Sequence, residues 1–525
     1  MNLNKARLCN LIWLLSQKGE NKEWRKGINN PEKIQLSKLF YYTRTNSNTS
    51  FGIQHEFKSI VSYSDYVNKV PIIEDRTVLN EWITQIVEGS ENVLTADKVI
   101  GFEETSGTSG SPQLIPYTAT LKKEFSVAVA TWMNELNSVL PSTFNGRCYW
   151  SLSPATRQVK RTASGLQIGL DNDMEYFRWP ASTLLKQILA LPPATSKITE
   201  AKAFYDATIL NLLQCNDLSF ISVWSPSFFL KLDEHLRSRI TELPSLLQKK
   251  TPEQFKKNIA AITAGATWKE IWPGLSCFSS WTDAQSTIWL PQVKKILGDV
   301  AIQPKGLLAT EGVTSIPIAM EGSAAAFTSH FYEFRDVTNG QILLLHEILE
   351  NKTYEVILTT GGGLYRYATN DLISVTGYLG KVPQMVFVGR KNKTVDMVGE
   401  KLAEVEVNKA ISVLMNRYPS LSIAILLPVN DERCAGYVLV TDGEDNINRL
   451  SETLQQILCA GNPYFKHAID IGQLSAIKHF YAPARQINHL LLELAGRKYK
   501  REGDAKIPTL LQVDMAAELL KRLSA

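Results

Sequence analysis

Short apolar segments rich in β-branched and aromatic residues alternate with helical runs through most of this 525-residue chain. Because strands that alternate with helices become covered on their faces, the alternation predicts an α/β fold with buried sheets flanked by helices. The chain is too long for one ordinary domain, and its 44% of hydrophobic residues can form a large core. The expected strands are Cys148 to Leu152, Leu218 to Val223, Cys277 to Ser280, Val300 to Leu308, Gln341 to Leu349 and Tyr354 to Thr360.

The alternation restarts beyond Gly389, and this indicates a second domain. The charged residues Arg390, Lys391 and Lys393 suit an exposed hinge. We therefore expect a large N-terminal domain over residues 1–388, a hinge over 389–393 and a small mobile C-terminal α+β domain over 394–525. Its expected elements are helices at 403–416 and 448–460 and strands at 421–428, 436–441 and near 469–481.

The first residues predict an amphipathic helix that docks on the body, because Leu8, Leu11, Ile12 and Leu15 recur at helical spacing. The apolar run is interrupted by Asn10 and no small-residue cleavage site follows, so a secretion signal is not favoured. No run of about 18 apolar residues occurs, and we expect no membrane span.

Charge and cysteine usage exclude several classes of function. The net charge is only +4, and the 56 Lys and Arg residues are dispersed among 52 Asp and Glu residues. Neither a nucleic acid nor an anionic membrane is therefore expected as a partner. The six cysteines are far apart without a Cys-x-x-Cys pair, which argues against zinc and against a disulfide framework. We expect a monomer in the reducing cytoplasm.

A loop rich in glycine and hydroxyl residues lies within Glu103 to Tyr117 and can wrap an anion. Glycines let backbone N–H groups approach a phosphate closely, and hydroxyl groups add further donors. No lysine closes the loop in the Gly-Lys-Ser/Thr manner, so the P-loop of common NTPases is excluded. An ordinary surface turn is the alternative interpretation. The residues concerned are Ser106, Gly107, Thr108 and Ser109.

Further stretches follow this loop in a fixed order: Gly306 to Gly312, Gly363 to Asp371, Gly389 to Glu406 and Ala505 to Pro508. In that order they resemble the core motifs of the adenylate-forming enzymes. The likeness is greatest to the auxin-responsive (Gretchen Hagen) family of acyl-acid amido synthetases, because Val-Pro-Ile before residue 73 and Ile-Trp-Pro before residue 274 also fit. The resemblance covers roughly residues 55 to 510.

The resemblance implies a role for each motif. Thr310 and Glu311 would lie beside the α-phosphate, with Glu311 the ligand of a magnesium ion. Asp371 would bind the ribose hydroxyls, assisted by Arg390. Lys506 would be the adenylation lysine, brought to the nucleotide by a swing of the small domain. The β- and γ-phosphates would be held by Ser106, Gly107, Thr108 and Ser109.

The segments that border the acyl site in that family contain several aromatic residues, which would suit a flat or cyclic acid. Core packing explains the same aromatic residues equally well. Neither the acid nor the amino acid can be identified from the sequence. The candidate acyl-binding residues are Trp224, Ser225, Trp281 and Thr282.

Three positions depart from the family pattern. Gln113 stands in place of a lysine, so one phosphate contact is neutral, and Leu307 or Leu308 replaces an aromatic residue. Asn370 replaces a glycine before Asp371, but Asn tolerates a left-handed backbone, so we expect the turn to survive.

The resemblance predicts an enzyme with ATP and Mg²⁺ as cofactors and a small carboxylic acid and an amino acid as substrates. The acid would first be adenylated, and the amine would then attack the acyl-adenylate. Two alternatives stay open: an acyl-CoA synthetase, which shares the adenylation step, and a nucleotide- or acyl-binding protein without turnover.

Overall fold

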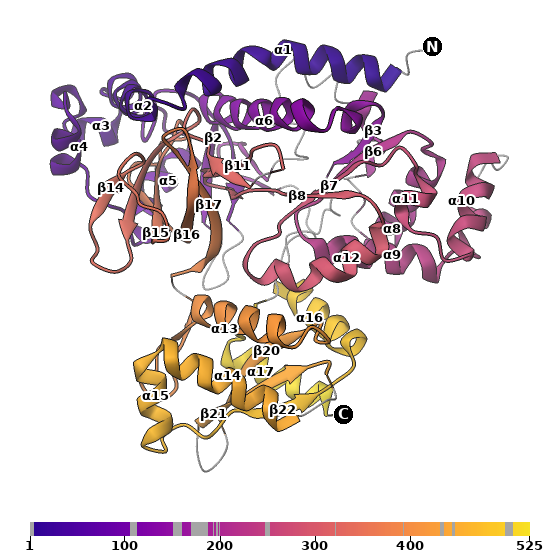
Figure 1. The fold of residues 1–525 in the computed structure, drawn as a ribbon. Helices are drawn as coiled ribbons and strands as arrows, with labels where there is room; N and C mark the ends of the chain where they lie inside the picture. The colour runs from indigo at the N-terminus through magenta and orange to yellow at the C-terminus, as the bar shows by residue number, and fades with distance from the viewer. Residues whose placement is uncertain are drawn as a thin grey trace.

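The computed structural model describes residues 5–105, 113–150, 160–169, 187–192, 194–195, 198, 200–246, 253–320, 322–391, 393–430, 435–443, 447–498 and 508–524. Sheets flanked by helices form a large body up to residue 390 and a smaller body after it (Figure 1). The expected fold class is confirmed. The hinge and the mobility of the smaller body stay predictions.

A four-stranded parallel sheet, in the order β3-β6-β7-β8, forms one half of the large body. Every residue of β6 and β7 is buried, as expected for strands with helices on both faces. The carboxyl ends of parallel strands share one edge, where open α/β sheets bind ligands. The strands are Arg147–Trp150, Leu218–Ser222, Cys277–Ser280 and Ala301–Pro304, and this half contains α8 (Ala201–Gln214), α9 (Pro226–Ser238), η5 (Leu243–Leu246), α10 (Glu253–Thr263), α11 (Trp268–Ile271), η6 (Ala284–Trp289) and α12 (Leu290–Leu297).

A seven-stranded antiparallel sheet, in the order β11-β12-β17-β16-β15-β13-β14, forms the other half. Its longest pairing joins β16 to β17, with Asp371 opposite Arg390 and Leu379 opposite Val382. The strands are β11 (Ser315–Pro317), β12 (Ser323–Ala325), β13 (Phe331–Asp336), β14 (Ile342–Leu344), β15 (Thr353–Thr359), β16 (Tyr367–Leu379) and β17 (Val382–Arg390).

Two smaller sheets carry sequence motifs. The first, in the order β2-β1-β5-β4, pairs the strands on either side of residues 106–112. The second is a hairpin of β9 (Leu308–Ala309) and β10 (Gly312–Val313), with Glu311 in its turn. The strands of the first sheet are β1 (Val99–Glu104), β2 (Leu114–Thr118), β4 (Lys160–Arg161) and β5 (Gln167–Ile168).

The N-terminal helix α1 (Lys5–Gly27) forms and packs along α6 (Ala119–Val139) on the outside of the large body (Figure 1). The expectation that its leucine-rich stripe docks is wrong. Leu8 and Leu15 are 45% and 59% exposed, whereas Trp13 and Trp24 on the opposite face are buried. The docked face also carries Ala6, Cys9 and Leu14, so together with the two tryptophans it offers a continuous apolar surface to the body.

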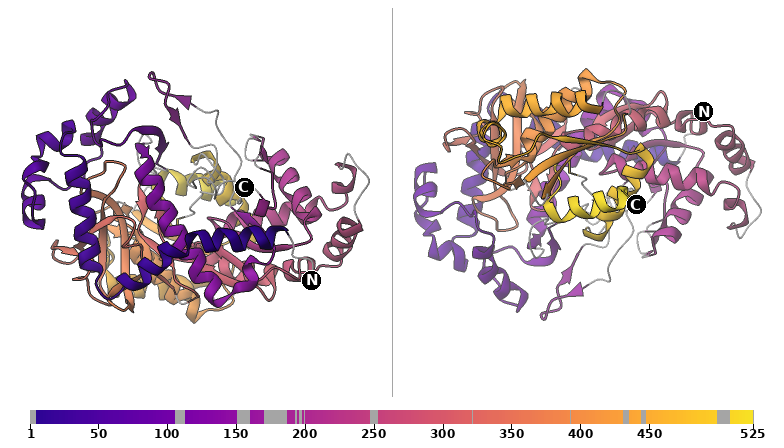
Figure 2. Two further views of the ribbon diagram at one scale, coloured as in Figure 1. Left: turned by 90° about the horizontal axis from the view of Figure 1, so that it is seen from above. Right: turned by 90° about the horizontal axis from the view of Figure 1, so that it is seen from below.

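The remaining helices before β3 lie in two places: those of residues 31–87 lie beside the antiparallel sheet (Figure 2), and η2 contacts β6 of the parallel sheet. No helix in the described ranges is long and apolar enough to cross a membrane. These helices are α2 (Pro31–Thr45), α3 (Ser50–Gln54), η1 (Phe57–Ser59), α4 (Tyr63–Lys69), α5 (Thr77–Val87) and η2 (Pro141–Phe144).

The smaller body has a three-stranded sheet, β20-β21-β22, and its own apolar core, which includes Leu402, Val407, Leu454 and Phe465. The expected helices and first two strands are present, but the last strand is confined to 478–481 because α15 extends to Asp470. The elements are β18 (Thr394–Val395), β19 (Leu402–Ala403), α13 (Glu404–Arg417), β20 (Ala424–Asn430), β21 (Ala435–Thr441), α14 (Ile447–Gly461), α15 (Pro463–Asp470), β22 (Lys478–Tyr481), α16 (Ala484–Lys498) and α17 (Val513–Leu523).

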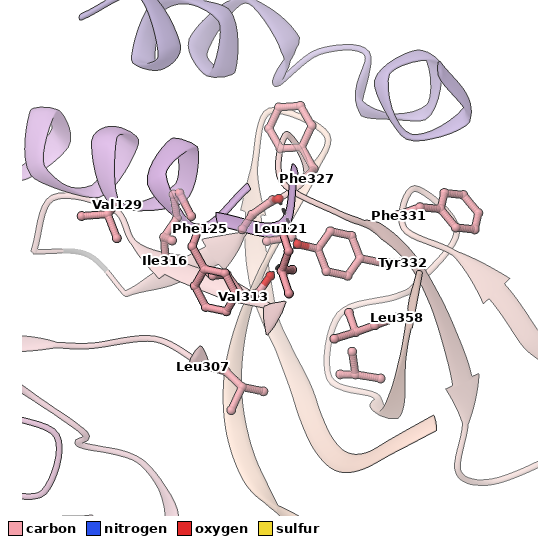
Figure 3. Close-up of a cluster of buried hydrophobic side chains, with 14 of the residues drawn as sticks. Leu121, Phe125, Val129, Leu307, Val313, Ile316, Phe327, Phe331, Tyr332 and Leu358 are labelled. Carbon is pink, nitrogen blue, oxygen red and sulfur yellow. Dashed lines mark hydrogen bonds between the residues drawn. The ribbon is translucent and has the colours of Figure 1, made fainter. Parts of the chain in front are cut away.

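One apolar cluster supports the hairpin that contains Glu311. Leu307 and Val313, on either side of the hairpin turn, belong to the same buried cluster as Leu121 and Phe125 of α6 (Figure 3). The core therefore fixes the base of the hairpin and leaves its polar turn to face the site.

Candidate active site

The carboxyl edge of the parallel sheet carries two tryptophans and a lysine. Trp281 directly follows β7, Lys305 directly follows β8, and Trp224 follows β6 by two residues. The backbone N–H of Trp281 donates to the backbone carbonyl of Trp224 at 2.9 Å, and the centroids of the two indole rings are 5.7 Å apart. The Nζ of Lys305 lies 4.1 Å from the Trp224 ring centroid, within cation–π range. The structure thus brings together the tryptophans that we expected at the acyl site.

Ser225 and Thr282 are beside these tryptophans, but their hydroxyls take part in local structure. The Ser225 hydroxyl caps α9 by accepting the Ser227 N–H, and the Thr282 hydroxyl donates to Asp283 at 3.2 Å. Asp283 also accepts the N–H of Phe387 in β17, which ties this edge to the antiparallel sheet. Desolvation raises the pKa of the Asp283 carboxyl. As contacts of an acid, Ser225 and Thr282 stay predictions.

Glu311 lies in the turn of the β9–β10 hairpin and is 5% exposed. Its carboxylate Oε1 is 3.9 Å from Nη2 of Arg76, the residue before α5. The carbonyl of the neighbouring Thr310 accepts a hydrogen bond from the Tyr117 hydroxyl at 2.8 Å. The backbone of the turn is therefore fixed, while the carboxylate has a loose ion pair and no closer one among the residues that the structure describes.

Asp371 lies on β16 and is 3% exposed. Its Oδ1 is 2.8 Å from Nε of Arg390, which stands directly opposite on β17. Asn370 has a φ of 63°, so the expected left-handed backbone before Asp371 is present, but it lies within β16, at an irregularity in the pairing with β15, and not in a turn. The structure brings Asp371 and Arg390 together as a tight pair, which is compatible with joint binding of a sugar.

Tyr367 connects the surroundings of the two carboxylates. The guanidinium carbon of Arg76 lies 5.5 Å from the centroid of the Tyr367 ring, and Nη2 of Arg76 donates to the Thr369 carbonyl at 3.3 Å. Burial is the largest cause that raises the pKa of Tyr367, followed by the negative charge of Glu311. Glu311, Arg76 and Tyr367 therefore form one electrostatically coupled group.

A buried network behind the hairpin joins it to the turn that precedes β16. Glu124 of α6 accepts the Gly361 N–H at 3.0 Å and lies 2.9 Å from Nδ1 of His330. Nε2 of His330 accepts the Val313 N–H at 3.0 Å, so Nδ1 must carry the proton that is donated to Glu124. The network holds the hairpin and the turn in one arrangement.

The residues expected to hold the β- and γ-phosphates lie outside the described residues, as does Lys506. The base of the loop is described: the Thr105 N–H donates to the Gln113 carbonyl at 2.8 Å, and the Gln113 N–H donates to the Thr105 hydroxyl at 3.2 Å. The two strands on either side of the loop are thus joined up to its base. The undescribed loop residues are Ser106, Gly107, Thr108 and Ser109.

Magnesium would need ligands from the nucleotide as well as from the protein. Within the described ranges, no group of three or more His, Cys, Asp and Glu side chains could hold a metal ion. Glu311 offers a single buried carboxylate, and Mg²⁺ is commonly bound by one or two carboxylates together with substrate phosphates. Glu311 therefore fits a magnesium ion that arrives with a nucleotide.

Three residues of this region were missed by the sequence interpretation. Lys305 could have been found, because a lysine directly after an apolar strand is unusual. Tyr367 stands within a quoted motif, but the sequence does not tell where its hydroxyl points. Arg76 belongs to a segment far from the other motifs, and no local pattern connects it with Glu311.

Comparison with protein-family models gives two matches. The model of the GH3 family N-terminal domain matches residues 21–302, and that of the GH3 family central domain matches residues 324–390.

Curated relatives include two proteins of Arabidopsis thaliana. The chain is 21% identical over 430 residues to indole-3-acetic acid-amido synthetase GH3.4, covering 73% of this chain and 71% of the relative. It is 22% identical over 393 residues to 4-substituted benzoates-glutamate ligase GH3.12, covering 66% and 67%.

Solved structures share the fold. The AtGH3.15 acyl acid amido synthetase in complex with 2,4-DB matches with a TM-score of 0.82 at 17% identity, over 97% of this chain and 96% of that one. A 2-hydroxyisobutyryl-CoA ligase in the postadenylation state matches with a TM-score of 0.52 at 12% identity, over 94% and 91%.

Proposed function

Because the chain belongs to the GH3 family, we propose that it is an ATP-dependent acyl-acid amido synthetase. It adenylates a small carboxylic acid, with release of pyrophosphate, and transfers the acyl group to the amine of an amino acid, with release of AMP. The observation that carries the proposal is the coupling of two buried carboxylates, Glu311 of a hairpin turn and Asp371 of β16, through Arg76 and Tyr367. Such a pair can hold the two polar ends of one nucleotide.

In the first half-reaction an oxygen of the acid's carboxylate attacks the α-phosphorus of ATP. The bond from that phosphorus to the oxygen that bridges to the β-phosphate breaks, and pyrophosphate leaves with both electrons. Asp371 and Arg390 bind the ribose and fix the α-phosphate relative to the acid, because positioning and charge stabilisation are the main contributions to such a transfer. Magnesium held by Glu311 would neutralise charge on the phosphate oxygens.

Lys506 takes part in this step as a mobile cation that bridges the acid's carboxylate and the α-phosphate. The C-terminal domain, 394–525, brings it to the nucleotide by rotating about 389–393. The apolar cluster that lies wholly within that domain supports the proposal, since a body with its own core can move as a unit. Ile425 and Leu427, on the other face of β20, belong to a second cluster that the domain shares with the large body.

In the second half-reaction the neutral amine of an amino acid attacks the carbonyl carbon of the acyl-adenylate, and AMP leaves. No covalent bond to the enzyme is needed. Burial raises the pKa of the Cys148 and Cys277 thiols to about 12, so neither is a reactive thiolate at neutral pH.

The acid is flat or cyclic in this proposal, because Trp224 and Trp281 lie together at the carboxyl edge of the sheet. We also propose a monomeric, cytoplasmic enzyme. The cysteines in the described part of the chain are free, which fits a reducing compartment.

Mass spectrometry of reaction products tests the proposal. The purified protein is incubated with Mg²⁺, ATP and a pool of aromatic, indolic, jasmonate-like and fatty acids, with amino acids in one tube and coenzyme A in another. New acyl-amino acid masses together with AMP are expected. Thioester masses only in the coenzyme A tube would instead identify an acyl-CoA synthetase. Binding of ATP without any product in either tube would leave two explanations, an acid missing from the pool or a protein without turnover.

A further inference from the structure

The Val70 to Ile73 segment is fixed against the strand that carries Asp371. The Ile73 N–H donates to the Arg366 carbonyl at 2.9 Å, and the Ala368 N–H donates to the Ile73 carbonyl at 3.0 Å. The guanidinium of Arg366 donates to the Val70 carbonyl at 2.9 Å. This attachment places Arg76, three residues after Ile73, beside the candidate nucleotide site.

Arg76 retains hydrogen-bonding capacity there. Its side chain is 22% exposed, and its Nη2 is 3.9 Å from the Glu311 carboxylate, beyond the length of a hydrogen bond. A guanidinium has five N–H donors, and the bond to the Thr369 carbonyl uses one of them. Arg76 can therefore bind a further anion without breaking its present contacts.

Tyr367 provides a second, independent observation. Its side chain is 1% exposed, and its hydroxyl has no hydrogen-bond partner among the described residues. A buried hydroxyl without a partner costs free energy, and the large majority of buried polar side-chain atoms in native proteins have a hydrogen-bond partner. The guanidinium of Arg76 packs over the ring that bears this hydroxyl, and the negative charge of Glu311 raises the pKa of Tyr367.

We propose that Arg76 binds the phosphate groups of the nucleotide, and that Tyr367 supports its guanidinium and donates its hydroxyl to the same ligand. A planar guanidinium can donate two parallel hydrogen bonds to phosphate oxygens, which an ammonium cannot. In the nucleotide-free protein the same group balances the buried Glu311 carboxylate. The inference rests on the proposed function, because it requires that the site accepts ATP.

Isothermal titration calorimetry of the full chain with ATP and with adenosine tests whether Arg76 binds the phosphate groups. The Arg76→Ala variant should bind ATP about tenfold or more weakly, since a charge-assisted hydrogen bond is lost, while its affinity for adenosine stays unchanged. Arg76→Lys should recover only part of the loss, and Tyr367→Phe should show a smaller loss in the same direction.

Lys69→Ala is the control, because Lys69 directly precedes the same segment, pairs with the exposed Glu56 and does not contact Glu311 in the described structure. It should bind both ligands like the unmodified chain. Equal binding of ATP by Arg76→Ala and the unmodified chain would overturn the inference alone. A parallel loss of ATP and adenosine would assign Arg76 a structural role and would overturn it too. If the unmodified chain does not bind ATP, the proposed function fails as well.

Discussion

The two carboxylates of the candidate site are buried alike but held differently. Asp371 is 3% exposed and pairs at 2.8 Å with Arg390, its opposite residue in the β16–β17 ladder. Glu311 is 5% exposed and lies in the two-residue turn of the β9–β10 hairpin, with its Oε1 3.9 Å from Nη2 of Arg76. Backbone pairing thus sets the geometry of the Asp371–Arg390 pair before any ligand binds. The Glu311–Arg76 pair is looser and leaves room for a ligand between its two side chains.

The difference fits the proposed chemistry. A ribose is bound in the same way before and after adenylation, so a pre-formed partner is suitable. The phosphates are divided between two products, so their site must bind first a triphosphate and then release pyrophosphate. We infer that Asp371 mainly provides affinity for the nucleoside and its position, and that Glu311 mainly provides rate.

The rigidity of the Asp371 side should depend most on Arg366. Its guanidinium makes bonds of 2.8 to 3.1 Å to the Glu333 carboxylate, and both side chains are almost fully buried. Arg366→Met should lower the free energy of unfolding by about 3–5 kcal/mol in urea denaturation, because it leaves Glu333 charged and unpaired.

Arg485→Met serves as the control, since Arg485 forms an exposed ion pair with Glu234. Its effect should be below about 1 kcal/mol. If Arg366→Met and Arg485→Met lowered the free energy of unfolding equally, the buried Arg366–Glu333 pair would not be what holds the Asp371 side rigid.

Glu311→Gln should lower the rate of acid-dependent ATP–pyrophosphate exchange by about a hundredfold or more, because the charge that acts on the phosphates is lost. Adenosine affinity, measured by calorimetry, should be unchanged. A variant that exchanges pyrophosphate normally would contradict the role given to the loosely held carboxylate.

Asp371→Asn should weaken the binding of both ATP and adenosine by about tenfold to a hundredfold, since charge-assisted hydrogen bonds to the ribose are lost. The same titration checks this. A loss for ATP alone would mean that Asp371 acts on the phosphates, and the assignment of the two sides would have to be exchanged.

Asp283 extends the comparison to a carboxyl without a cationic partner among the described residues. Desolvation raises its pKa in the folded protein, so the protonated form is favoured there. Its contribution to stability is complete below the ordinary carboxyl pKa of about 4 and is lost as the pH rises through the raised folded pKa.

Asp283→Asn should therefore be more stable than the unmodified chain at about pH 8 and not at about pH 4, because the amide is neutral throughout and can still accept the Phe387 N–H. Urea denaturation at both values measures the difference. If the variant gained the same stability at about pH 4 and at about pH 8, the charge of Asp283 would not be the cause of the gain.

Local patterns in the sequence predicted most elements, but the expected strand Gln341 to Leu349 is reduced to β14 (Ile342–Leu344), and the expected strand Val300 to Leu308 ends at Pro304. The expected strand Cys277 to Ser280 coincides with β7, because a short apolar run between helices has few other solutions. Asn370 adopts a left-handed backbone within β16, because Asn is among the few residues that tolerate one. The periodicity of α1 predicted a helix but not the docked face, since Trp13 and Trp24 compete with the leucines for the core.

Contacts between distant segments were not predictable in the same way. Arg76 reaches the site because the Val70 to Ile73 segment adds to a strand that lies almost 300 residues later in the chain. Spacing within one segment carries no information about such pairing. The motif order indicated which carboxylates meet, and the structure added the cation and the hydroxyl beside them.

The central claim is that the chain activates a carboxylic acid as its adenylate, and isotope transfer tests it most directly. An acid that the product survey identifies is supplied with heavy oxygen in its carboxylate, together with Mg²⁺, ATP and the amino acid. The account predicts that AMP released with the amide carries one heavy oxygen, since a carboxylate oxygen becomes bonded to the α-phosphorus. Unlabelled AMP, or heavy oxygen in inorganic phosphate with ADP as the product, would contradict it.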